Sequence, residues 1–202
     1  MAKVKTSKKM TAIDMTAMCD VAFLLLTFFI LTATARQPEP LPVDTPASTV
    51  QTKLPESNLA TITIGDKKVF FGVTGQQVRR KTLELMSAEY GVEFSEDEKQ
   101  KFALIETFGV PMESLKSIIQ MKSAERIEAG QPGIPIDSTN NQLEDWVRNA
   151  RIATADLDDK DLQIAIKGDQ REEYPIIKRV MDILQDQKIN SFNLVTGLRG
   201  EN

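Results

Sequence analysis

The sequence predicts a single transmembrane helix followed by an α+β domain: a small mixed sheet with helices, enlarged by an extra helical insertion. Three observations predict this fold class. An apolar segment near the amino terminus is long enough to cross a membrane, a proline-rich stretch follows it, and strand-like segments occur near both ends of the remainder. We divide the 202 residues into a basic tail (1–12), a transmembrane helix (13–36), a linker (37–58) and a domain (59–202) whose insertion covers about 76–154.

The transmembrane helix follows the lysines of the tail and is itself nearly free of charge. From Met15 to Ala35 the one formal charge is Asp20, and no lysine follows until Lys53. At about 1.5 Å per residue, a helix of this length would extend about 31 Å, close to the thickness of a bilayer core. The lysine excess before the helix predicts a cytoplasmic amino terminus and a domain on the opposite side of the membrane.

The same segment also fits a secretory signal peptide. Such a peptide requires a basic region, an apolar run such as 21–31, and a small-x-small triplet such as the Ala-Thr-Ala that ends at Ala35. Against cleavage, the basic region is unusually long and Asp20 would lie at the edge of the apolar core. A retained helix is favoured, and cleavage after Ala35 stays an alternative.

A polar stripe follows one face of this helix. At about 100° per residue, Thr16, Asp20, Thr27 and Thr34 fall within about 40° of one another. Such a stripe on an apolar helix favours a face that contacts protein or water rather than lipid. Alternatively, the threonines bond to the preceding turn of their own helix and the Asp20 carboxylate reaches the cytoplasmic headgroups.

Asp20 is the best-placed proton carrier in the sequence. The chain contains no histidine, which is the usual proton shuttle near neutral pH. A carboxyl group can be neutral in apolar surroundings and ionised beside a hydrated path. A device driven by protons needs that change of charge.

Other chemistry is not indicated. The net charge of −4 gives no sign of nucleic-acid binding, and the one cysteine, Cys19, excludes an internal disulfide or a multi-cysteine metal site. The acidic run Asp156 to Asp161 lacks the glycine and the glutamate of an EF-hand loop. Because no phosphate loop or nucleophile–base pair is present either, we expect no enzyme, no metal and no cofactor.

The rest of the chain predicts an extended linker and then an α+β domain. Five of the nine prolines lie between Gln37 and Ser57, which favours a solvated, semi-rigid spacer. The expected elements are strands at 59–64 and 69–73 joined by a turn at Gly65-Asp66, helices at 76–90, 96–108, 111–128 and 142–154, a loop at 130–141, a strand at 162–167, a helix at 174–187 and a strand at 192–196. Ser95 and Glu98 form a predicted capping box.

Two regions of the sequence resemble one known family. "IDMTAMCDV" at 13–21, with the leucines and phenylalanines after it, is similar to the amino-terminal signature of the ExbD/TolR family. "LQIAIKGDQREEYPIIKRVMDILQDQKINSFNLVTG" at 162–197 resembles the family's last strand, helix and strand, and Leu54-Pro55 resembles its linker element. The family's usual proline after the threonine is Ala17 here, and about 76–154 has no obvious counterpart, hence the predicted insertion.

The resemblance implies a motor subunit driven by the proton-motive force in a bacterial inner membrane, with a periplasmic domain. Protons would be the coupling ion, Asp20 would take and release them, and Thr16 would lie beside it. The implied partners are a second copy of the chain, an ExbB/TolQ-like channel protein, and a TonB-like or Tol-type envelope protein. The alternatives are a TolR-like component that contacts peptidoglycan, or a secreted binding module whose signal peptide is removed.

Overall fold

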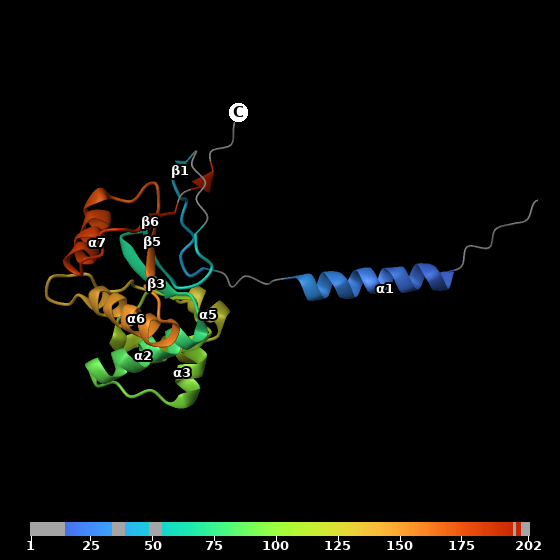
Figure 1. Cartoon of the computed structure of the whole chain (residues 1–202), viewed down its shortest axis with the longest axis horizontal. Coiled ribbons are helices and arrows are strands. Elements are labelled where there is room, and N and C mark those ends of the chain that lie inside the picture. Colours follow the sequence, from blue (N-terminus) through green and yellow to red (C-terminus); the bar gives the residue numbers. More distant parts are fainter. Residues whose placement is uncertain (1–14, 34–38, 49–53, 196, 199–202) are drawn as a thin grey trace, which may run out of the picture. The chain divides into compact units, whose positions relative to one another are not determined.

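The protein consists of one apolar helix and one α+β domain, as predicted (Figure 1). The computed structural model describes residues 15–33, 39–48, 54–195 and 197–198. The chain separates into two compact units, Met1–Gln37 and Pro38–Asn202. The first contains helix α1, Met15–Thr32, and the ends of the predicted span at 13–14 and 34–36 lie outside the described residues.

The domain is built on a mixed five-stranded sheet with the spatial order β4-β3-β2-β5-β6. The strands are β2 (Leu59–Gly65), β3 (Lys68–Val73), β4 (Thr107–Phe108), β5 (Gln163–Gly168) and β6 (Asn193–Leu194). The β2–β3 and β3–β4 pairs are antiparallel, and the β2–β5 and β5–β6 pairs are parallel. A second sheet pairs β1 (Ala47–Ser48) in parallel with β7 (Gly197–Leu198). The sequence did not predict β1, β4 or β7.

The register of the sheet puts its apolar residues in rows on one face. Ile62 of β2 is opposite both Phe71 of β3 and Ile166 of β5, and Phe71 is in turn opposite Phe108 of β4. All four side chains are buried. Because successive residues of a strand point to opposite faces, Thr61 and the other neighbours of these residues face the other way.

The β2–β3 hairpin turns one residue later than predicted. Gly65 still pairs with Lys68, so the two-residue loop is Asp66-Lys67, and both residues have positive φ, 50° and 59°. Two consecutive residues of positive φ are the geometry of a type I′ turn, which matches the right-handed twist of the strands. Asp tolerates this conformation better than most residues, which accounts for its position in the loop.

Two of the predicted helices are interrupted. The helix expected at 96–108 ends at Ala103 as α3 (Glu96–Ala103), and Thr107–Phe108 form β4 instead, because their pairing with β3 outweighs the local helical pattern. The helix expected at 111–128 is a short 3₁₀ helix and two short α-helices. Their bounds are η1 Met112–Ser114, α4 Leu115–Gln120 and α5 Ser123–Glu128. Met121 has an extended backbone and breaks the pattern between α4 and α5.

The remaining helices agree with the sequence pattern. They are α2 (Gln76–Tyr90), α6 (Gln142–Asp158) and α7 (Tyr174–Asp186). Helix α2 has the predicted bounds, α6 is four residues longer than predicted, and α7 is one residue shorter. Helix α6 continues into the acidic run and ends where Asp159 adopts the left-handed conformation.

An aromatic cluster joins the predicted insertion, residues 76–154, to the sheet. Trp146 of α6 is fully buried, and its ring centroid lies 4.7 Å from that of Phe108, 5.9 Å from that of Phe102 and 6.5 Å from that of Phe71. Phe71 belongs to the hairpin, whereas the other three residues come from the insertion. The insertion therefore shares one hydrophobic core with the sheet and is not a separate module.

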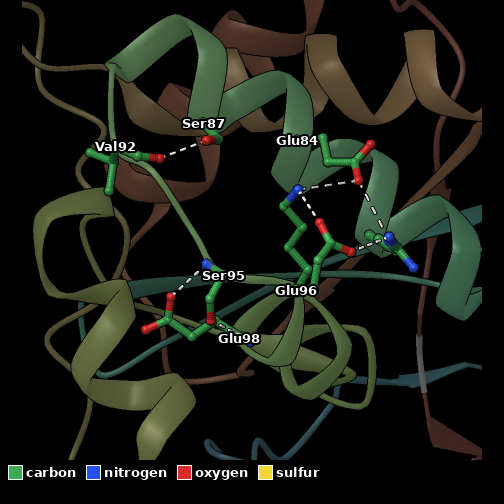
Figure 2. Close-up of polar contacts among 8 residues, drawn as sticks. Glu84, Ser87, Val92, Ser95, Glu96 and Glu98 are labelled. Carbon is green, nitrogen blue, oxygen red and sulfur yellow. Dashed lines mark hydrogen bonds and ion pairs between the residues drawn. The ribbon is translucent and has the colours of Figure 1, made fainter.

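Polar contacts fix α3 against α2 at the domain surface (Figure 2). The capping box is confirmed: the Ser95 amide donates to Glu98 Oε2 at 2.9 Å, and the Glu98 amide donates to Ser95 Oγ at 3.3 Å. Glu96 accepts from Lys99 at 2.7 Å and also pairs with Arg80 of α2. Because most of these side chains are partly exposed, we expect orientation rather than much stability from the ion pairs.

Candidate functional site

Helix α1 carries three of the four predicted site residues. It has 18 residues, a mean hydropathy of 2.0 and no buried residue, so its length and composition suit a membrane span. Its length is about 27 Å at 1.5 Å per residue, and Asp20 lies about 7.5 Å from its start. Because Met15–Thr32 forms one continuous helix, the spacing of Thr16, Asp20 and Thr27 puts these three positions on one face of it. Thr34 lies outside the described residues.

The hydroxyl group of Thr27, one threonine of the stripe, forms its hydrogen bonds within its own helix. Thr27 Oγ1 donates to the carbonyl oxygens of Phe23 at 2.9 Å and Leu24 at 3.0 Å. Thr32, which the sequence reasoning did not single out, donates in the same way to Phe28 at 2.8 Å. For Thr27 the alternative of local bonding therefore holds. Its oxygen can still accept a hydrogen bond, but its proton is already engaged.

The Asp20 side chain, unlike the hydroxyl groups of Thr27 and Thr32, does not bond to the described residues of its own helix. In the described part of the chain, its carboxylate makes no hydrogen bond or ion pair. An ionised aspartate costs about 2.5 to 3.5 kcal/mol at the centre of a membrane helix, and nearer an end, where Asp20 lies, it costs less. A partner on another chain, or a water-filled path, would offset that cost.

The segment after the helix lies against the domain over part of its length, contrary to the expectation of a solvated spacer. Glu39 pairs with Lys167 of β5, and the Asp44 amide donates to Asp169 Oδ2 at 3.2 Å. A Cβ built on Gly65 would lie 2.8 Å from Val43 Cγ1 and 3.0 Å from Leu41 Cδ2, so these side chains contact the end of β2. We call residues 39–44 the docked segment.

The docked segment lies over the face of the sheet that carries Thr61 and Thr63. A hollow of about 120 Å³ lies between them and is lined by Pro40, Leu41, Thr61, Thr63 and Lys167, among others. The backbone amides of Arg171 and Asp44 donate to the Asp169 carboxylate and lower its pKa below the usual value. No local pattern in the sequence indicates the partners of the docked segment, because Lys167 and Asp169 lie more than a hundred residues away along the chain.

The comparisons with known proteins decide the family. The sequence model of the biopolymer transport protein ExbD/TolR family matches residues 6–198. The chain belongs to the ExbD/TolR family. The match extends across both regions of resemblance and the insertion between them. No curated protein and no solved structure gives a significant match.

Membership of the ExbD/TolR family supports the interpretation of the apolar helix as a membrane span. The family couples energy to biopolymer transport, and its members generally work with ExbB/TolQ-type and TonB/TolA-type partners. The match begins before α1 and therefore includes it. Together, the family and the helix indicate a single-pass membrane protein in which Asp20 is an acidic group within the span.

Proposed function

We propose that this chain is the proton-coupled subunit of an ExbB-ExbD-type complex in a bacterial inner membrane. Two copies associate with an ExbB/TolQ-like channel protein, Asp20 takes and releases protons, and the resulting motion does work on a TonB-like envelope partner. One observation carries the proposal: Asp20 is the single charged residue of a continuous apolar helix, and no described residue pairs with it. The family match supports the transport role.

The cost of an unpaired carboxylate supports a site that changes protonation. In lipid a carboxyl group favours the neutral form, and beside a hydrated path it favours the ionised form. Moving one charge through 100 mV supplies about 2.3 kcal/mol, which is comparable to the cost of burying that charge in the helix. Protons can therefore drive Asp20 between lipid and a hydrated path with the energy that a membrane potential provides.

The substitution Asp20→Asn tests the proposal. It keeps the size and polarity of the side chain and removes its ability to exchange a proton, so we expect proton flux to be abolished while assembly persists. The measurement is dye-reported proton flux into liposomes that contain the chain with its co-purified channel protein. Cys19→Ala, the adjacent substitution on the same helix, should leave flux unchanged. Full flux in Asp20→Asn would refute the role of Asp20.

Two experiments distinguish the proposed function from its alternatives, which are a secreted binding module and a TolR-like role. Mass spectrometry of the mature amino terminus tests cleavage after Ala35, which would remove Asp20 and leave a secreted binding module. The inclusion of the helix in the family match supports retention. Co-purification with a TonB-like protein supports ExbD-like use, whereas co-purification with Tol-type proteins or binding to peptidoglycan supports a TolR-like role. The lysine excess before α1 supports a cytoplasmic amino terminus and a periplasmic domain.

A further inference from the structure

Strand β3 has one edge that the insertion covers. On its other side β3 pairs with β2 along its whole length, from Lys68 to Val73. Residues 69–73 read Val-Phe-Phe-Gly-Val, which are uncharged and mostly of high β-propensity. Segments of this kind pair readily with strands of other chains when their edge is free.

Residues of the insertion occupy this edge at every second position of β3. The Ile134 amide donates to the Val69 carbonyl at 2.8 Å, Phe71 pairs with Phe108 of β4, and Arg79 Nη1 donates to the Val73 carbonyl at 2.7 Å. In an antiparallel ladder, alternate residues direct their backbone groups to the same side. The three contacts therefore meet the groups that β3 directs away from β2.

Strand β4 packs tightly against this edge of β3. A Cβ built on Gly72 would lie 2.4 Å from the Glu106 carbonyl oxygen, and one on Gly109 would lie 2.3 Å from Phe70 Cδ1. The Gly109 amide donates to Oε1 of the buried Gln131 at 2.6 Å. The Gly109 carbonyl accepts from the Gly133 amide at 2.7 Å. Residues 106–109 and 131–134 thus form one layer along β3.

We propose that the insertion seals the β3 edge and prevents it from pairing with an extended strand, in particular with β3 of a second copy of this chain. Strand β4, the 131–134 segment and the Arg79 side chain make the seal. This role belongs to the insertion alone and does not depend on proton coupling. The insertion thereby protects the sheet edge from pairing with other chains.

The substitution Gly109→Ala tests the seal, because its methyl group must displace either β4 or the buried Phe70 ring. In the full-length chain in detergent, we expect hydrogen exchange in residues 69–73 to become at least tenfold faster. A labelled peptide with the sequence of residues 104–111 should bind the variant at least tenfold more tightly than the unmodified chain. Gly168→Ala is the matched control, since its Cβ would meet nothing closer than 3.8 Å.

Three outcomes would overturn the proposal. The exchange rate could stay unchanged, the opened edge could fail to bind the peptide or a second copy, or a scrambled peptide could bind equally well. Should Gly109→Ala unfold the domain, as judged by circular dichroism, Gln131→Ala replaces it. That change shortens the buried side chain that accepts from the Gly109 amide, adds no bulk beside Phe70, and is subject to the same expectations.

Discussion

At the scale of single residues, Trp146 joins the insertion to the hairpin. Its side chain is fully buried among three phenylalanine rings, and its Nε1 has no hydrogen-bond partner in the described chain. Truncating a buried Trp or Phe to Ala typically costs 3 to 5 kcal/mol. We expect Trp146→Ala to lower the free energy of unfolding by about that amount. Urea denaturation followed by circular dichroism measures it, and Tyr174→Ala, at a residue 66% exposed, should change it by under about 0.5 kcal/mol.

Asp169 makes the docked segment sensitive to acid. The backbone amides of Arg171 and Asp44 lower the pKa of Asp169 in the folded state, so the ionised form stabilises this contact. The contribution is present above the ordinary pKa of an aspartate and is lost as pH falls through the lower, folded value. The amide resonance of Asp44 should therefore titrate with Asp169 below the usual aspartate range in NMR spectra. In Asp169→Asn that titration should be absent. An Asp44 amide that titrates alike in both proteins would contradict the assignment.

At the scale of elements, α3 depends on its capping box. Ser95 accepts from the Glu98 amide and Glu98 accepts from the Ser95 amide, so two donors of the first turn are satisfied together. Ser95→Ala should cost about 1 kcal/mol, the typical value for a lost N-cap. Thermal unfolding measures this as a lower Tm. Ser117→Ala is the control, because that exposed hydroxyl bonds only to the carbonyl three residues earlier, and it should leave the Tm nearly unchanged.

Elements with local signals were predictable from the sequence, and those with distant partners were not. Helix α2 follows from periodicity, and α3 begins at its capping box. Strand β4 could not be foreseen, because its partner Phe71 lies far away in the sequence and its own residues continue a helical pattern. The docked segment was missed for the same reason, since its partners Lys167 and Asp169 belong to the other end of the domain.

The candidate site was predictable only in part. Composition and helical phase located Asp20 and its face, because both depend on spacing along one helix. The hydrogen bonds of Thr27 depend on its side-chain rotamer, which spacing does not determine. Spacing along the helix does not specify what Asp20 contacts, because no described residue of this chain pairs with it.

At the scale of the whole molecule, the insertion is part of the domain's core. Trp146, Phe102 and Phe108 all come from it. Trp146 and Phe108 pack on Phe71 of the sheet, and Phe102 packs on Trp146 and Phe108. Deleting residues 76–154 would remove these side chains together with α2 and α6, and would leave the apolar rows of β2 and β3 exposed to water.

We therefore expect the deletion of residues 76–154 to yield an unfolded or aggregated domain rather than a smaller folded one. Circular dichroism and size-exclusion chromatography of the purified chain test this. The matched control replaces α5, residues 123–128, with a Gly-Ser segment of equal length. Because α5 contains no buried residue, that chain should remain folded. A deletion chain that unfolds cooperatively and elutes as a compact species would mean that the sheet and α7 hold a core of their own.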